Sequence, residues 1–253
     1  MQLSYYSIVI PAYNEGRRLA STLDQVTAFI AQQRWRAEIV VVNDGSTDNT
    51  AELVRRYARQ NPVIRLVENP GNRGKGFSVR NGMLNAKGDI LLFTDADLSA
   101  PIGEAPKLIA ALEAGADIAI GSRWVDPSLQ THRQTVLRQV LGRVYNLLMR
   151  GILGLDFKDT QCGFKAFTRN AARQIFPAQH IERWGFDPEL LFLARRSGLK
   201  VKEVGVHWGH DSGTRIHPFR DGFQMLMEML SIRWTDMRGD YQIAAASAAK
   251  LSS

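Results

Sequence analysis

GDILLFTDADLS (residues 88–99) joins a run of apolar residues to a pair of carboxylates. The run Ile90–Phe93 does not alternate in polarity, which is typical of a strand covered on both faces in a mostly parallel sheet. Asp95 and Asp97 follow where that strand is expected to end. Mg²⁺ and Mn²⁺ prefer oxygen ligands and are usually completed by water and substrate phosphates. An acidic pair alone is a weak signal, but this placement predicts a divalent metal ion at one edge of a sheet.

Comparable β-rich runs and segments of helical length surround this stretch. Expected strands cover residues 6–11, 38–43, 63–68, 89–94 and 117–121, and expected helices cover 50–60, 77–86 and 102–114. The alternation predicts an α/β protein with a Rossmann-like, mostly parallel central sheet and helices on both faces. Ligands of such sheets bind beyond the carboxyl ends of the strands.

The second half of the chain is less regular. Helical segments are expected at 133–155 and 218–238, and further strands at 164–168 and 201–207. We expect one domain over residues 1–240, with helical additions in its second half, and a frayed tail over 241–253.

Composition limits the possible classes of protein. Hydrophobic residues make up 45% of the 253, and the formal net charge of +7 favours anionic partners such as phosphorylated substrates or acidic lipid. The chain has no basic platform interleaved with aromatic residues, so we expect no nucleic acid. One cysteine, Cys162, excludes an intramolecular disulfide and favours a reducing, cytoplasmic compartment. No run of 18 apolar residues and no signal-peptide pattern occur, so we expect no transmembrane helix.

Two further strand ends carry polar residues toward the same edge. They are PAYNE (11–15) and NDGSTD (43–48). Turns and helix caps are the alternative interpretation, because Asp44 begins a turn signal and Asn49 could form a capping box with Glu52. The sequence favours that alternative for Asp48 and Asn49, and less so for Asp44.

NRGKG (72–76) precedes an expected helix. Glycines free the backbone, a helix N-terminus attracts anions, and Arg73 and Lys75 add positive charge. A basic surface turn is an equal alternative. The spacing is not that of a P-loop, and the first strand lacks the glycine-rich turn of a dehydrogenase.

Taken together and in this order, five motifs resemble glycosyltransferase family 2, an inverting family with the GT-A fold. They are IVIPAYNE (8–15), VVNDGSTDNT (41–50), NRGKG (72–76), TDADLS (94–99) and GSRW (121–124). DTQCGFKAF (159–167) and WGFDPELLFLA (184–194) are similar to the branch of dolichyl-phosphate β-glucosyltransferases and related polyprenyl-phosphate glycosyltransferases.

The resemblance implies a donor site and a metal site. The residues that would line a uridine pocket are Pro11, Ala12, Tyr13, Glu15 and Asp44. Asp44 could accept the imide N–H of uracil. Lys75 would lie near the donor diphosphate, against which Asp95 and Asp97 would hold Mg²⁺ or Mn²⁺. Ser99 stands where this branch often has a glutamine, which puts a metal ligand there in doubt.

The resemblance also implies an acceptor site. Arg123 and Arg138 would grip a phosphate through their planar guanidinium groups, and Gln161 and Lys165 would lie nearby. Asp187 would join Asp95, Asp97 and Arg123 as a catalytic residue. Without the resemblance, Arg138 is interpreted as a solvated helix charge, and Asp187 as part of a helix start with Pro188 as first helical residue.

The implied reaction is inverting transfer of a hexose, with glucose favoured, from a UDP-sugar to a dolichyl or polyprenyl phosphate. Such a phosphate is largely ionised at neutral pH, so it needs no strong general base. N-acetylglucosamine or another sugar, a soluble or polymeric acceptor, and a non-enzymatic nucleotide-binding module are the alternatives. We expect residues 1–122 to form the nucleotide-sugar half of a GT-A domain and 123–240 the acceptor half. The amphipathic segments 133–155 and 218–238 either cover the core or lie on the cytoplasmic face of a membrane, with which we expect peripheral association.

Overall fold

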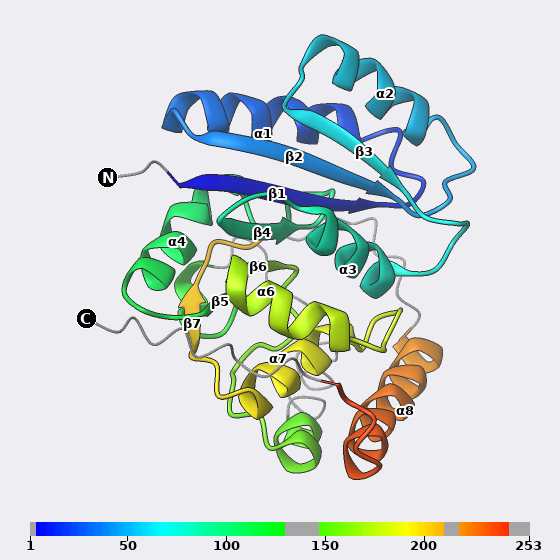
Figure 1. Ribbon diagram of the computed structural model, residues 1–253, viewed down its shortest axis with the longest axis vertical. Helices are drawn as coiled ribbons and strands as arrows, with labels where there is room; N and C mark the ends of the chain where they lie inside the picture. Colours follow the sequence, from blue (N-terminus) through cyan, green and yellow to red (C-terminus); the bar gives the residue numbers. More distant parts are fainter. Residues whose placement is uncertain (1–3, 130–146, 210–217, 243–253) are drawn as a thin grey trace.

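Seven strands form one sheet in the computed structural model, which describes residues 4–129, 147–209 and 218–242 (Figure 1). The strands are β1 (Tyr5–Ala12), β2 (Arg36–Asn43), β3 (Ile64–Glu68), β4 (Ile90–Thr94), β5 (Ile118–Ser122), β6 (Phe164–Thr168) and β7 (Val201–Gly205). Their order is β3-β2-β1-β4-β6-β5-β7, and β6 runs antiparallel to both β4 and β5. The other pairs are parallel, so the predicted mostly parallel α/β sheet is confirmed.

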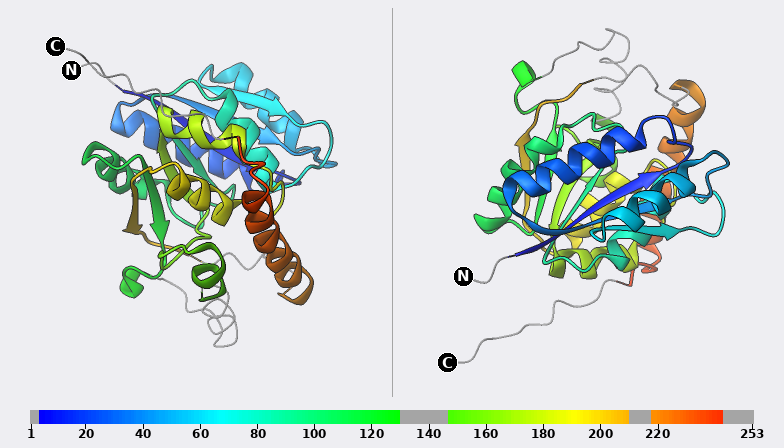
Figure 2. Two further views of the ribbon diagram at one scale, coloured as in Figure 1. Left: turned by 60° about the horizontal axis from the view of Figure 1, so that its bottom comes forward. Right: turned by 90° about the horizontal axis from the view of Figure 1, so that it is seen from above.

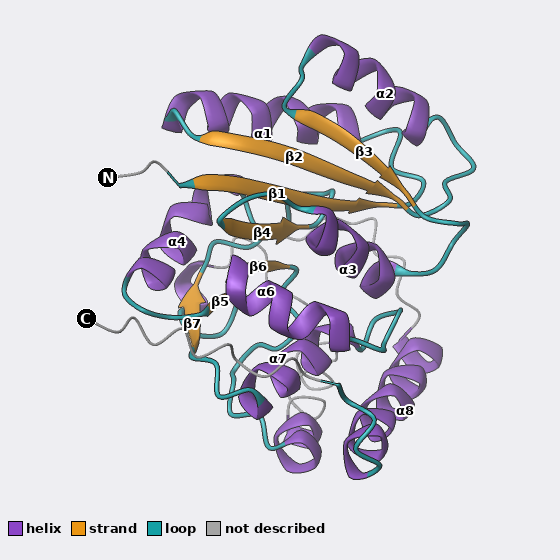
Figure 3. Ribbon diagram, viewed as in Figure 1, coloured by secondary structure: helices purple, strands orange, loops and turns teal. Residues whose placement is uncertain are grey.

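Helices cover both faces of the sheet (Figure 3). They are α1 (Leu19–Gln33), α2 (Thr50–Gln60), α3 (Lys75–Asn85), α4 (Ala105–Glu113), α6 (Arg169–Ile175), α7 (Phe186–Arg196) and α8 (Pro218–Met237). Ile8 and Ile10 pack with α1, α2 and α4, whereas Val9 packs on the other face with α3, α6 and α7. All three are fully buried. Both faces of β1 are thus core, which explains apolar runs without alternation.

The carboxyl ends of β1, β2 and β4 meet at one edge because these strands are parallel neighbours. Ala12 is level with Asn43, and the backbone N–H of Asp44 donates to the Ala12 carbonyl at 2.9 Å. β4 ends at Thr94, so the chain leaves the sheet at the same edge through Asp95. The fold therefore gathers the three predicted polar strand ends.

Two expectations about helix starts were wrong. Asn49 precedes α2, but its side chain makes no capping hydrogen bond; Asp48 instead accepts from the Thr50 N–H at 3.0 Å. Helix α7 begins at Phe186 rather than Pro188, which is the third residue of its first turn.

Other boundaries differ by a few residues. Helix α3 begins two residues early, the last strand ends at 205, and the segment 102–114 divides into η1 (Ile102–Glu104) and α4. Residues 147–153 are helical, and the remainder of the expected helix 133–155 up to residue 146 lies outside the described residues. No helix in the described ranges is both long and apolar enough to cross a bilayer.

Candidate active site

The loop after β1 is tied to the loop after β2. Asn14 has a φ of 52°, and its side-chain oxygen accepts from the Thr47 N–H at 2.8 Å. Asp48 accepts from the Gly16 N–H at 3.0 Å and from the Thr50 hydroxyl at 2.5 Å. These contacts give Asp48 the turn role that its sequence context favours.

The residues expected to line a uridine pocket lie along these loops. Pro11 and Ala12 are the last residues of β1, and Ala12 is buried so that its methyl group packs in the core. Tyr13 is 37% exposed, and Glu15 pairs with Arg18 at 2.7 Å. The structure therefore brings them to the edge where β1 and β2 end.

Asp44 fastens the loop that carries the NRGKG motif. One carboxylate oxygen accepts from the Asn69 amide at 2.7 Å and the Arg73 N–H at 2.9 Å, and the other accepts from the Gly74 N–H at 2.8 Å. Gly74 has a φ of 112°, and a Cβ there would lie 2.6 Å from the Glu182 carbonyl oxygen, so this turn requires glycine. A carboxylate offers about four acceptor positions. Those of the buried Asp44 are thus largely committed to the loop, a role that the sequence did not indicate.

Lys75, the first residue of α3, faces the acidic pair. Its Nζ lies 2.6 Å from Asp95 Oδ1 and 5.7 Å from the centre of the Trp184 ring. Burial lowers the pKa of Lys75, but Asp95 and then Asp187 raise it, and the pKa ends above its usual value. The amine therefore stays charged at neutral pH.

The two aspartates after β4 differ in their surroundings. Gly163 packs against Asp95 so closely that a Cβ would lie 2.1 Å from Asp95 Oδ2. Asp97 Oδ1 accepts from the Ser99 N–H at 2.9 Å, and its other oxygen lies 3.9 Å from Arg18. Both side chains are about a quarter to a third exposed, at 30% and 27%. Each can therefore meet a ligand from solvent.

Lys165 and Asp187 form a buried ion pair behind this acidic pair. Lys165 Nζ lies 2.5 Å from Asp187 Oδ1 and 2.7 Å from the Cys162 carbonyl oxygen, and its side chain is fully buried. Burial raises the pKa of Asp187, an effect that Lys165 opposes. The expected phosphate contact of Lys165 does not fit this arrangement, because the amine is enclosed by its protein partners.

Arg123 forms a forked ion pair with Asp159. Its Nε and Nη2 donate to the two carboxylate oxygens at 2.6 and 2.8 Å, and its backbone N–H donates at 3.0 Å. Burial raises the pKa of Asp159, but Arg123 outweighs it and holds that pKa below its usual range. Gln161 donates its backbone N–H to the same carboxylate at 3.2 Å. The guanidinium group expected to grip phosphate thus binds a carboxylate in this structure.

These side chains act on one another electrostatically, and we call them the ion cluster. Its members are Lys75, Asp95, Asp97, Arg123, Asp159, Lys165 and Asp187. Burial within it raises the pKa of Cys162 to about 12. The thiol is therefore protonated at neutral pH and is a poor nucleophile.

The loop at residues 179–185 supports the NRGKG motif from the opposite side. Glu182 pairs with the Arg73 side chain, and its carbonyl accepts from the Phe77 N–H at 2.9 Å. Glu189 in turn accepts from the His180 and Ile181 N–H groups at 2.9 and 2.8 Å. Glu189 is fully buried, so it holds this loop rather than facing a ligand.

The ion cluster brings together the four expected catalytic residues, which are Asp95, Asp97, Arg123 and Asp187. Arg138, an expected acceptor contact, lies outside the described residues. Sequence reasoning missed Asp159 and Trp184. Asp159 opens the quoted motif DTQCGFKAF and Trp184 opens WGFDPELLFLA, so the motifs contained both without indicating a partner.

Known proteins share this sequence pattern and fold. A model described as Glycosyl transferase family 2 matches residues 7–176. A dolichyl-phosphate beta-glucosyltransferase of Trichomonas vaginalis is 42% identical over 216 residues, which cover 81% of this chain and 64% of the relative. Proteins of the same name from Dictyostelium discoideum and Homo sapiens are 36% and 31% identical over 94% of this chain and 77% of their own lengths. The matched region thus spans less than the full length of each relative.

Solved structures share the fold at lower identity. Glucosyl-3-phosphoglycerate synthase from Mycobacterium tuberculosis, solved with Mn²⁺, UDP and glucosyl-3-phosphoglycerate, has a TM-score of 0.65 and 21% identity. The match covers 90% of this chain and 80% of that one. Together with the family model, this likeness confirms the expected GT-A fold.

Proposed function

The chain belongs to glycosyl transferase family 2, and from that premise we propose that it transfers glucose, with inversion, from UDP-glucose to dolichyl or another polyprenyl phosphate. One observation carries the proposal: the similarity to dolichyl-phosphate beta-glucosyltransferases over 94% of the chain. The ion cluster at the carboxyl edge of the sheet supports it, because such edges are where α/β proteins bind ligands. Residues 1–122 would bind the donor and 123–240 the acceptor.

The donor nucleotide would bind where β1 and β2 end. Tyr13 is exposed there and could contact the base, with Pro11, Ala12 and Glu15 shaping the pocket through the loop. Asp44 accepts three hydrogen bonds within the described part of the chain, and its fourth acceptor position could take the uracil imide N–H. Asp44 would then couple uridine binding to the placement of Lys75 beside the diphosphate.

The charge of the ion cluster supports a metal requirement. Its three cations face four carboxylates, so the cluster alone does not favour a diphosphate. Asp95 and Asp97 would hold Mg²⁺ or Mn²⁺, and Gly163 allows the Asp95 carboxylate to lie directly against the backbone there. No three metal-ligating side chains converge within the described residues, which suits an ion completed by water and diphosphate oxygens. Such an ion would stabilise the negative charge of the departing UDP.

The acceptor phosphate would approach Arg123, and Asp187 would help to orient the reacting groups. Because Lys165 is enclosed, we assign it to orienting Asp187 rather than to direct contact. Arg123 would exchange part of its pairing with Asp159 for the phosphate, with Arg138 and Gln161 nearby. The phosphate is already ionised near neutral pH, so alignment with the anomeric carbon would replace a strong general base. The lipid tail implies peripheral binding at a membrane surface.

A donor and acceptor panel tests this function. UDP- and GDP-sugars are incubated with the protein, Mg²⁺ or Mn²⁺, and a short polyprenyl phosphate, and products are identified by mass. We expect a lipid-phosphate-hexose from UDP-glucose and none when the phosphate-free alcohol replaces the acceptor. Product from UDP-N-acetylglucosamine would change the assigned sugar. Transfer to a soluble phosphate but not to the lipid phosphate would overturn the acceptor.

A further inference from the structure

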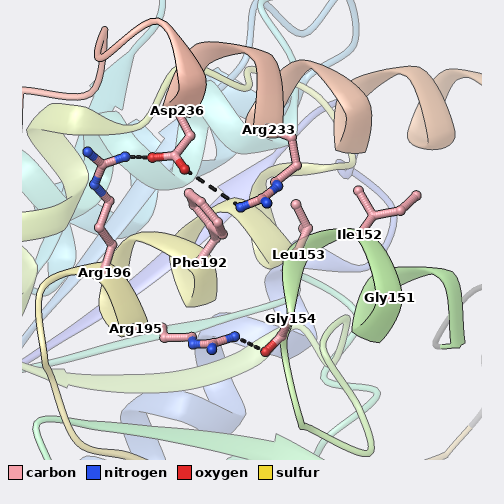
Figure 4. A pocket seen from close by; sticks show the side chains of 9 residues that line it. All are labelled: Gly151, Ile152, Leu153, Gly154, Phe192, Arg195, Arg196, Arg233 and Asp236. Carbon is pink, nitrogen blue, oxygen red and sulfur yellow. Dashed lines mark hydrogen bonds and ion pairs between the residues drawn. The ribbon is translucent and has the colours of Figure 1, made fainter.

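A cavity of about 520 Å³ lies at the end of α7 that is remote from the ion cluster (Figure 4). Its walls come from the segment 151–154, from the last turn of α7 and from α8. Asp187 lies in the first turn of α7 and Arg195 in its last turn. They are eight residues, or about 12 Å, apart along the helix. The volume is within the range of pockets that hold small ligands, roughly 300–1,000 Å³.

Positive charge dominates this cavity, which we call the arginine pocket. Among the described residues that line it, three are arginines, Arg195, Arg196 and Arg233, and a single one, Asp236, carries a carboxylate. Arg195 donates to the Gly154 carbonyl and Arg196 pairs with Asp236. Arg233 reaches Asp236 only at 3.7 Å and is 47% exposed. Arg195 and Arg196 therefore stabilise the fold through these contacts. Arg233 offers a planar set of hydrogen-bond donors suited to a phosphate group.

Apolar surface continues from the mouth of the pocket along α8. Leu230, Trp234 and Met237 are 44%, 62% and 77% exposed. Arg233 follows Leu230 by three residues and precedes Met237 by four, so it lies on the same side of the helix. Trp234 adds a large aromatic side chain of the kind found at membrane interfaces.

The helical segment 147–153 adds to this surface. Leu147 and Leu148 are 70% and 40% exposed. Figure 1 and the left view of Figure 2 both draw this segment and α8 on the side of the molecule away from β1, β2 and β3. A cationic pocket beside exposed apolar side chains matches a ligand with an anionic head and apolar chains.

We propose that the arginine pocket binds the phosphate of an anionic phospholipid, while the exposed apolar residues of α8 and the segment 147–153 enter the acyl boundary of the membrane. This site is separate from the proposed acceptor site. The two proposals have in common only that both place the protein at a membrane. Lipid binding here is measured without transfer, so failure of one proposal can be told from failure of the other.

The test compares sedimentation of the full chain with phosphatidylcholine vesicles and with vesicles that also contain phosphatidylglycerol. Arg233→Gln should weaken binding to the anionic vesicles about fivefold, since a basic residue at such a surface contributes about 1 kcal/mol. Arg233→Lys should recover part of this loss, because Lys keeps the charge but not the planar donors. Trp234→Ala should weaken binding to both kinds of vesicle. Arg196 is left unchanged, because its loss would strip Asp236 of its partner.

Arg59→Gln is the matched control, because Arg59 is exposed on α2 at the opposite side of the molecule in Figure 1. Equal losses for the variants at Arg59 and Arg233 would show a general charge effect and overturn the pocket. Weaker binding of inorganic phosphate by Arg233→Gln, with vesicle binding unchanged from wild type, would identify a soluble anion and overturn the lipid assignment. Equal binding of the wild-type protein to vesicles with and without phosphatidylglycerol would also overturn the lipid assignment.

Discussion

Replacing Asp187 by asparagine tests the buried ion pair behind the acidic pair. Lys165 is fully buried and its Nζ lies 2.5 Å from Asp187, so the substitution leaves an ammonium without its counter-charge. Removing one partner of a buried pair costs about 3–5 kcal/mol. For a protein of this size each kcal/mol lowers the melting temperature by about 2–4 °C, so we expect a fall of roughly 6–20 °C. Thermal unfolding followed by circular dichroism measures it.

Two further variants make the test decisive. Asp240→Asn is the matched control, because Asp240 pairs with Arg238 at 3.1 Å on the surface, where such pairs contribute at most about 1 kcal/mol. Lys165→Met combined with Asp187→Asn removes both charges of this pair and should regain most of the lost stability. If this folded double variant still lacks transfer activity, the Lys165–Asp187 pair serves the reaction as well as the fold. Melting of Asp187→Asn at the temperature of Asp240→Asn would refute the reasoning.

Three other outcomes follow from the site. Exhaustive chelation should abolish transfer, and Asp97→Asn should lose more activity than Asp48→Asn, whose carboxylate holds a turn; full activity without metal would remove the metal role. Asp44→Asn should weaken UDP binding in calorimetry and speed proteolysis near residues 69–74, which Asp44 fastens; unchanged affinity in a folded variant would count against the uridine pocket. Burial raises the pKa of Glu189 to about 7, above the 4.5 of a free side chain, so the folded state retains a proton that the unfolded state has released. Wild-type stability should therefore fall as pH rises from about 4.5 to 7, by up to about 3 kcal/mol relative to Glu189→Gln in denaturant unfolding, and equal slopes for the two proteins would contradict this.

The sheet could be predicted because its strands carry local signals. The apolar runs in β4 and β2 do not alternate in polarity, and residues 91–93 and 39–42 proved to be buried with side chains packed on both faces of the sheet. Boundaries were less predictable where tertiary contacts set them. Helix α3 begins at Lys75 because Gly74 turns against Glu182, more than a hundred residues away in the chain, and no local pattern reports such a contact.

The partners of the charged residues follow from topology. Strand β6 enters antiparallel between β4 and β5, where Lys165 is level with both Phe93 and Ile120. That register puts Lys165 between the strand that leads to Asp95 and the strand that leads to Arg123. The motifs identified all three residues as site members, but which carboxylate neutralises which cation depends on this insertion. The burial that it imposes is why Lys165 is better placed to orient Asp187 than to touch a phosphate, although its sequence context implied direct contact.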